Sequence, residues 1–222
     1  MPDLAPPPKY ADSPVRHVLP AGTELFRVHL TKFDATSFRP DPSDEHFGGG
    51  RFDGTERDPY PTYYAAPHSS TALMEYLGRD LRVLSNGLRT AGYAKVKGRQ
   101  LSAVRTTREL TLVSLLSGPD LAAVAQDEWL IQSEDYGKTR RWSNWIRQQA
   151  EWAHGLVWPS KRDVGKPALV LFGDRCGPEV LEVSRQIDLS TPVGTRHVNV
   201  LLSAYRVQVT TGKGRKSRPV TG

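Results

Sequence analysis

Arg51 follows three consecutive glycines in the segment FGGGRFDG at residues 47–54. Glycine lets the backbone approach a ligand closely or adopt a positive φ, and the planar guanidinium of arginine matches the oxygen atoms of a phosphate. The segment fits neither GxGxxG nor GxxxxGKS/T, so it does not predict a classical dinucleotide site or a P-loop. Alone, it is more typical of a flexible loop than of a ligand cradle.

Glu75 lies among apolar residues in the segment SSTALMEYL at residues 69–77. A carboxylate in such a segment either emerges on the solvent side of a helix or is held in a cleft, where it can do chemistry. For a single residue the solvent-exposed position is the more common one.

Ser160 lies in the turn WPSKRD at residues 158–163, directly after an apolar run. A rigid sheet can aim a hydroxyl group from a turn of this kind. Serine is also a common turn residue, and no histidine lies nearby in the sequence to activate it as a nucleophile. Taken singly, Ser160 is best interpreted as a turn residue.

The elements that must position these residues follow from periodicity, turn signals and N-cap residues. The predicted strands span residues 23–30, 62–66, 93–97, 110–116, 155–158, 167–172 and 198–209. The predicted helices span residues 69–78, 121–126 and 139–152, and the last has an aromatic face with Trp142, Trp145, Ile146 and Gln149. Arg27 lies on the polar face of the first strand, opposite its apolar face, and Tyr64 lies in the second strand.

The strands and helices do not alternate regularly, and the sequence has no internal repeat. This favours a mixed α+β fold over a doubly wound parallel sheet. We expect a Pro-rich extended segment at residues 1–20, a single domain at residues 21–210 and a basic, disordered tail at residues 211–222. The segment from 33 to 62 predicts a long loop.

The chain has 222 residues and a formal charge of +6, of which the tail residues Lys213, Arg215, Lys216 and Arg218 contribute four charges. A solvated tail explains that excess better than a nucleic-acid contact. Cys176 is the only cysteine, and the six histidines lack metal-ligand spacing, so neither a disulfide framework nor a metal site is predicted. Without a signal peptide or a long apolar stretch, a cytoplasmic protein with no membrane contact is expected.

Together, the weak signals occur in an order that resembles the RES-domain family. The segments FRVH, GGGRFDG, YYAAPHSSTALMEYL, GLVWPSKRD and KPALVLF carry the resemblance, over about residues 25–172. The most specific part is Tyr-x-Ala followed by Ala-Leu-x-Glu. This motif maps onto Tyr64 and Glu75, and the remaining family positions map onto Arg27, Arg51 and Ser160.

The resemblance implies a split β-sheet core with flanking helices, related to ADP-ribosyltransferases of the diphtheria-toxin type. It also implies an enzyme that degrades NAD⁺ by hydrolysis or phosphorolysis, with NAD⁺ as substrate and no resident cofactor. Many members are toxins held inactive by a helix-turn-helix antitoxin, so an antitoxin or immunity protein is an implied partner. A homo-oligomer remains open.

For the reaction that the resemblance implies, each residue has a plausible role. Cleavage of the nicotinamide–ribose bond passes through an oxocarbenium-like state, which the carboxylate of Glu75 would stabilise. Arg27 and Arg51 would bind the pyrophosphate, and the ring of Tyr64 would stack on the nicotinamide. Ser160 would donate to the nicotinamide amide, a ribose hydroxyl or an incoming phosphate.

Two other functions remain open. The same site could transfer ADP-ribose to a macromolecule, which the loop at 33–62 would recognise. A third hypothesis is a non-catalytic module that binds nucleic acid through its tail and its Trp-rich helix, with an affinity that falls steeply as salt increases.

Overall fold

The computed structural model describes residues 5–7 and 12–210. The predicted basic tail at 211–222 lies outside the described residues, as do residues 1–4 and 8–11 of the predicted N-terminal segment. The described part is a mixed α+β structure with three sheets. It has no helix that is both long and apolar enough to cross a membrane.

The largest sheet has five strands, and the two smaller sheets have three each. The five-stranded sheet has the order β1 (Arg16–Leu19), β7 (Leu110–Ser114), β8 (Gly155–Pro159), β9 (Pro167–Phe172) and β3 (Thr62–Ala65). The second has the order β10 (Leu181–Asp188), β6 (Arg99–Thr106) and β2 (Glu24–Leu30), and the third has β11 (Val207–Thr210), β5 (Arg89–Gly92) and β4 (Arg82–Val83). Only the β7–β8 and β11–β5 pairs are parallel, so the predicted mixed sheet is confirmed.

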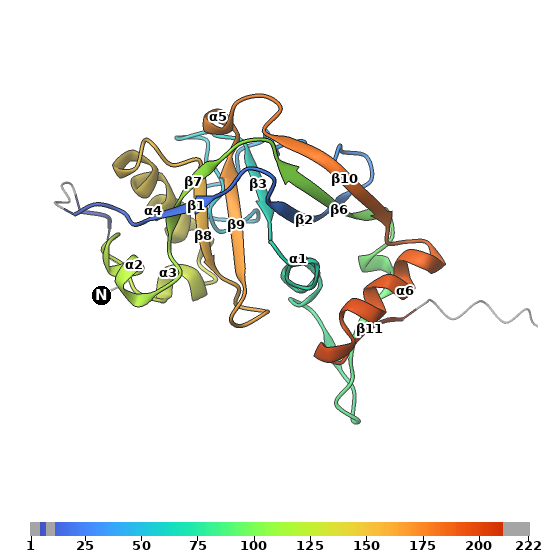
Figure 1. Ribbon diagram of the computed structural model, residues 1–222. Coiled ribbons are helices and arrows are strands. Elements are labelled where there is room, and N and C mark those ends of the chain that lie inside the picture. Colours follow the sequence, from blue (N-terminus) through green and yellow to red (C-terminus); the bar gives the residue numbers. More distant parts are fainter. Residues whose placement is uncertain (1–4, 8–11, 211–222) are drawn as a thin grey trace, which may run out of the picture.

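The five-stranded sheet and the β10–β6–β2 sheet are here called the two larger sheets, and the β11–β5–β4 sheet, whose strands are short, is called the small sheet. Helices pack against both larger sheets. They are α1 (Ser69–Leu77), α2 (Gly118–Ala122), α3 (Trp129–Gln132), α4 (Tyr136–Gln149), α5 (Gly173–Cys176) and α6 (Pro192–Leu201), with short 3-10 helices η1 (Tyr93–Lys95) and η2 (Ser203–Tyr205). Figure 1 shows α2, α3 and α4 on one side of the five-stranded sheet, α1 on its other side near the middle of the molecule, and α6 and β11 beyond α1 at the far end.

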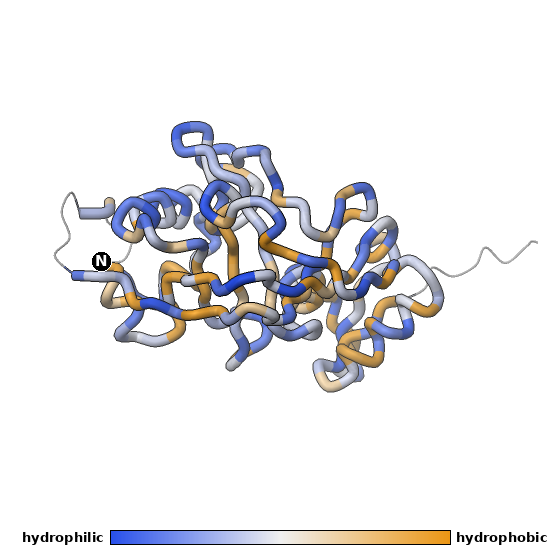
Figure 2. Tube along the Cα trace, turned by 45° about the horizontal axis from the view of Figure 1, so that its top comes forward, coloured by the Kyte–Doolittle hydropathy of each residue, from blue (hydrophilic) through white to orange (hydrophobic). Residues whose placement is uncertain are grey.

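The core has three layers because consecutive residues of a strand point to opposite faces of its sheet. In β9, Val170 and Phe172 pack toward α2, α3 and α4, whereas Leu169 and Leu171 pack toward the second sheet. A third apolar cluster joins the second sheet to α1, α6 and the small sheet. Figure 2 shows these apolar segments running through the middle of the molecule, with polar loops outside.

The two larger sheets meet at the ends of β2 and β3. Phe26 and Ala66 exchange two backbone hydrogen bonds, at 2.7 and 2.9 Å, just beyond the last residue of β3. The chain then enters α1 three residues later, so this junction sets where the helix begins. Arg27 and Glu75 are thereby carried on neighbouring elements.

Most elements near the candidate residues agree with the sequence prediction. The strands at β2, β3, β7, β8 and β9, the helix α1 and the long loop between β2 and β3 lie where periodicity predicts them. Residues 16–19 of the expected N-terminal lead-in are extended, but they form the edge strand β1 of the main sheet.

Several other predictions are wrong. Residues 93–95 form a 3-10 helix, and residues 198–201 end α6. Of the predicted last strand at 198–209, only residues 207–209 lie in a strand, β11. The Trp-rich helix buries Trp142, Trp145 and Ile146, but Gln149 is exposed. β2 has no solvent face, because Leu25 packs between the two sheets while Phe26 packs against α1. Strands β6 and β10 were not predicted, because both have a polar composition. β6 is stabilised by pairing with β2 and β10 on its two sides, whereas β10 is a largely exposed edge strand that pairs with β6 alone.

A substitution at Gly155, in β8, tests how closely the strands of the five-stranded sheet pack. A Cβ atom on this residue would overlap the backbone oxygen of Val170 on β9, whereas a Cβ atom on Gly92 in β5 would meet no atom within 4 Å. We expect Gly155→Ala to lower the free energy of unfolding by about 3 kcal/mol, because the strands must move apart. Gly92→Ala should change it by about 0.5 kcal/mol or less. Urea unfolding measures both, and equal losses would contradict the close approach.

Candidate active site

Four of the five predicted site residues, Arg27, Arg51, Tyr64 and Glu75, line one cavity of about 320 Å³. Its wall is formed by β2, β3, α1, the ends of β8 and β9, and the loop that follows the glycines. The charged side chains on this wall are Arg27, Arg39, Asp53, Arg51, Glu75, Arg79 and Lys161. Five cations against two carboxylates make the cavity suitable for an anionic ligand.

Glu75 lies on α1 and lines the cavity, one helical turn after the buried Thr71. Its Oε1 atom accepts a hydrogen bond of 2.5 Å from the hydroxyl group of Ser160. This contact joins residues 85 positions apart in the sequence. The Ser160 bond fixes the orientation of the carboxylate, because a charge-assisted hydrogen bond is short and directional.

Ser160 is 2% exposed and is not among the described residues that line the cavity. Its oxygen accepts hydrogen bonds from the backbone N–H groups of Arg162 at 3.2 Å and Asp163 at 3.0 Å. A hydroxyl group has a single proton to donate, and here that proton goes to Glu75. In this arrangement Ser160 orients the carboxylate and has no second proton for a ligand.

Arg51 reaches the opposite wall of the cavity. Its Nη1 atom donates to the backbone oxygens of Leu130, at 3.3 Å, and Ser133, and its guanidinium lies 5.2 Å from the ring centroid of Tyr136. Burial lowers the pKa of Arg51, and the charges of Tyr136, Tyr64 and Glu75 oppose that shift. The group is therefore held rigidly and is partly desolvated, which strengthens its attraction for an anion.

The three glycines are needed for two reasons: Gly48 and Gly49 have positive φ, and protein side chains pack closely against Gly49 and Gly50. Gly48 and Gly49 have φ values of 62° and 65°. A Cβ atom on Gly50 would lie 2.5 Å from the Tyr64 hydroxyl and 2.7 Å from Asp53 Oδ1. Of the two roles that the sequence suggested for the glycines, the positive φ is found at Gly48 and Gly49, and the close approach at Gly50 is to protein side chains.

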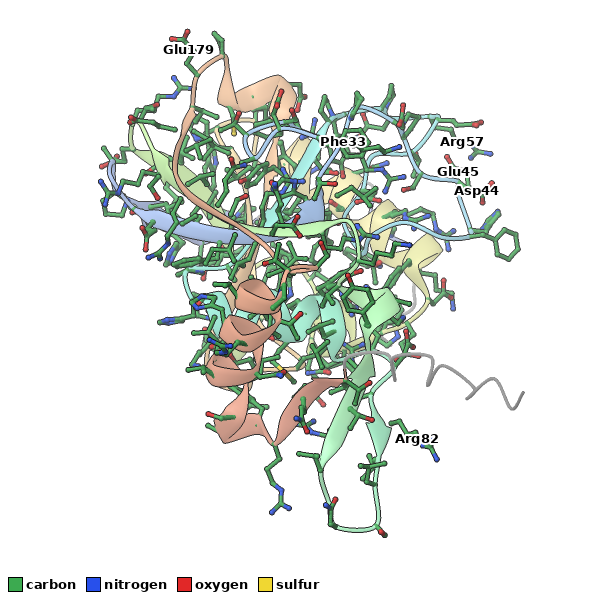
Figure 3. The ribbon with its side chains drawn as sticks, turned by 90° about the vertical axis from the view of Figure 1, so that its right-hand side faces the viewer. Phe33, Asp44, Glu45, Arg57, Arg82 and Glu179 are labelled. Carbon is green, nitrogen blue, oxygen red and sulfur yellow. The ribbon has the colours of Figure 1, made fainter. Side chains whose placement is uncertain are left out.

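Arg140 on α4 holds this loop through hydrogen bonds to its backbone. It is fully buried on α4, and its guanidinium donates to the backbone oxygens of Gly50 at 3.0 Å, Phe47 at 3.3 Å, Asp44 and Gly48. The loop runs along the outer edge of the molecule, where Figure 3 shows Asp44 and Glu45. One cation thus satisfies four backbone oxygens of a segment that has no helix or strand of its own.

Asp53 closes the same loop from the cavity side. Its Oδ2 atom accepts from the Gly50 N–H and the Ser43 hydroxyl, both at 2.6 Å, and from Arg39 at 3.0 Å. The Oδ1 atom is buried and has no hydrogen-bond partner. Asp53 therefore sets the position of the backbone that leads into Arg51.

Tyr64 lines the cavity beside Trp158, with their ring centroids 6.2 Å apart in an edge-to-face arrangement. Its hydroxyl oxygen accepts the Phe52 N–H at 2.9 Å. Burial, and then the charge of Asp53, raises the pKa of Tyr64 well above its usual value, so the group stays protonated. The two aromatic side chains form an apolar wall in an otherwise cationic cavity.

Arg27 lines the cavity from β2 and is held by the loop that follows that strand. Its Nη1 atom donates to the backbone oxygens of Ser37 at 2.7 Å and Ala35 at 3.4 Å. The guanidinium stacks 4.2 Å from the ring centroid of Tyr63, and burial lowers its pKa. The structure thus brings Arg27, Arg51, Tyr64 and Glu75 to one cavity, with Ser160 directly behind Glu75.

Sequence reasoning missed Asp53, Arg140 and Asp163. Asp53 lies within the FGGGRFDG segment and Asp163 within WPSKRD, so both were adjacent to chosen residues. Arg140 had no signal, because nothing in a helical sequence distinguishes a buried arginine from its exposed neighbour Arg141. Among the described residues, no group of three His, Cys, Asp or Glu side chains is placed to hold a metal ion.

Comparison with known proteins identifies a matching family model and a similar solved structure. The family model described as "RES domain" matches residues 24–194. A chain in the crystal structure of the M. tuberculosis MbcT–MbcA toxin–antitoxin complex has a similar fold, with a TM-score of 0.57 and 17% sequence identity. The similarity covers 82% of this chain and 92% of that chain. A search of curated proteins finds no matching sequence.

Arg140 provides a test of the loop geometry. We expect Arg140→Lys to lower the free energy of unfolding by about 2–3 kcal/mol, because a lysine cannot satisfy four backbone oxygens in a planar arrangement. Protease cleavage within residues 44–51 should also become faster. The matched control is Arg141→Lys, which changes an exposed residue on the same helix. Equal stability and equal cleavage of the two variants would contradict this role.

Proposed function

The chain belongs to the family of RES-domain proteins, and from this premise we propose that it cleaves the nicotinamide–ribose bond of NAD⁺. The observation that carries the proposal is the carboxylate of Glu75, fixed by Ser160 in a cavity with five cationic side chains. NAD⁺ combines two phosphates with an aromatic cation, and the cavity has complementary groups for both parts.

The chemistry of the bond explains the need for a fixed carboxylate. When the bond breaks, its electron pair leaves with neutral nicotinamide, and positive charge develops on the ribose carbon and ring oxygen. A carboxylate held near the ribose stabilises that charge without having to reorganise. Ser160 holds Oε1 of Glu75, so Oε2 is the oxygen we assign to the ribose.

The cationic side chains support binding of a pyrophosphate. Arg27 and Arg51 are anchored by backbone oxygens through one nitrogen each, and their planar groups line the cavity. Because an anchored guanidinium loses little freedom on binding, it binds phosphate more strongly than a mobile one. Arg79 and Lys161 add positive charge on the side of Glu75.

The aromatic wall supports binding of nicotinamide. Tyr64 and Trp158 lie between the glycine loop and the end of β8, close to the backbone that carries Ser160. A positively charged pyridinium ring is attracted to such faces by stacking and cation–π interactions. Departure of neutral nicotinamide removes the cation–π part, which favours its release.

A partner is also part of the proposal. The similar chain in the MbcT–MbcA structure comes from a toxin–antitoxin complex. We propose that this protein is likewise a toxin, and that an antitoxin or immunity protein restrains it. The arrangement of a deep cavity lined by cations suits a partner that presents acidic or polar groups at its entrance.

The function is tested by incubating the purified protein with NAD⁺, with and without inorganic phosphate, and identifying the products. Free nicotinamide with ADP-ribose indicates hydrolysis, and ADP-ribose 1″-phosphate indicates phosphorolysis. An ADP-ribosylated macromolecule would instead support transfer to an acceptor. If the wild-type protein neither bound nor consumed NAD⁺, the proposal would be overturned.

Glu75→Gln tests the role of the carboxylate. The amide oxygen can still accept the Ser160 hydrogen bond, so the fold should be retained while the negative charge is lost. We expect turnover to fall by roughly 100- to 1,000-fold or more, with the melting temperature nearly unchanged. Nicotinamide release is the measurement. Glu179→Gln is the control, because Glu179 is exposed at the far end of the molecule (Figure 3). Full activity of Glu75→Gln would contradict the assignment.

A further inference from the structure

Tyr205 connects the C-terminal part of the chain to the turn that carries Ser160. It lies in η2, just before β11 of the small sheet, and its hydroxyl group donates to Asp163 Oδ1 at 2.8 Å. Residue 205 lies beyond residues 24–194 that match the family model. The contact therefore comes from a part of the chain outside the family match.

Asp163 in turn joins the two elements that carry Glu75 and Ser160. Its Oδ2 atom accepts from the hydroxyl groups of Thr71 at 2.6 Å and Ser70 at 3.3 Å, both in the first turn of α1. Its backbone N–H donates to Ser160 at 3.0 Å. Asp163 is 5% exposed, so its hydrogen bonds are protected from water.

Lys166 determines the direction of the Tyr205 hydrogen bond. Its ammonium group donates to the Tyr205 oxygen at 2.8 Å and lies 3.2 Å from Asp163 Oδ2. Since Lys166 donates to the oxygen, the tyrosine proton is available for Asp163. Burial acts to raise the pKa of Asp163, but hydrogen bonds from Thr71, Tyr205 and Lys166 outweigh it and hold that pKa below its ordinary value.

We propose that Tyr205 is a positioning residue for the active site, acting through Asp163 to hold the Ser160 turn against the Glu75 helix. The inference rests on the proposed function of Glu75 and extends the site to the C-terminal segment. Tyr205 does not line the cavity, so it acts on the geometry of the carboxylate and not on the substrate. The C-terminal sheet is thereby coupled to catalysis.

Tyr205→Phe removes the hydroxyl group and keeps the ring. The matched control is Tyr93→Phe, because Tyr93 is also half-buried near the C-terminal elements and its hydroxyl donates one hydrogen bond, to Ser190 at 3.0 Å. We expect kcat for NAD⁺ cleavage to fall roughly 10- to 100-fold in Tyr205→Phe, since small misplacements of a catalytic group have effects of this size. KM should stay within about twofold. The control should keep wild-type kcat.

Amide hydrogen exchange tests the contact without relying on activity. In Tyr205→Phe, the peptide covering residues 159–166 should exchange roughly tenfold faster, because the turn opens more readily. In Tyr93→Phe it should exchange as in the wild type. Unchanged exchange of this peptide in Tyr205→Phe would overturn the proposal, and so would faster exchange with unchanged kcat. An inactive wild-type protein would refute the proposed function, while exchange would still decide whether Tyr205 holds the turn.

Discussion

The hydrogen bond between Ser160 and Glu75 forms only if several surrounding elements hold the two residues in position. Two backbone N–H groups of the following turn donate hydrogen bonds to the serine oxygen and so fix its orientation. In this orientation the serine proton points at the carboxylate. That turn must therefore be closed, and it must face the correct side of α1. The turn is closed because it connects the paired strands β8 and β9. It faces the correct side of α1 because the junction of β2 with the end of β3 sets where α1 begins.

The opposite wall of the cavity depends on buried polar groups. Arg140 and Asp53 hold a loop that has little regular secondary structure, and they do so by satisfying its backbone oxygens and N–H groups. A buried charged group is costly when its hydrogen bonds are lost, and both Arg140 and Oδ2 of Asp53 make several bonds to this loop, so the loop has few alternative conformations. Arg51 is presented from this rigid backbone, directly opposite Glu75. Rigidity in both walls is what an enzyme needs to stabilise a charge that exists only in the transition state.

The layered fold explains why one cavity can collect residues from so many elements. The five-stranded sheet and the β10–β6–β2 sheet pack against each other through β2, β6, β7 and β9. The cavity is lined by apolar and aromatic residues of β2, β3, β8 and β9, and by charged residues from β2, α1 and the connecting loops. The small C-terminal sheet lies against α1 and α6, which brings Tyr205 to the back of the site.

The sequence alone determined the elements that carry the candidate residues and the family to which they belong. Strong local patterns made this possible: the two serines at which α1 begins, the apolar runs of β8 and β9, and the glycines before Arg51. The N-cap of α1 is His68, whose side chain makes no capping hydrogen bond, so the serines marked the start of the helix without capping it. The polar strands β6 and β10 were not predicted because they are stabilised by pairing with strands distant in the sequence, β6 with β2 and β10, and β10 with β6. Only the tertiary structure decided that Ser160 donates to Glu75, that Arg140 is buried, and that Asp163 meets Tyr205. Each of these contacts joins residues more than 40 positions apart, or depends on burial that a local pattern does not encode.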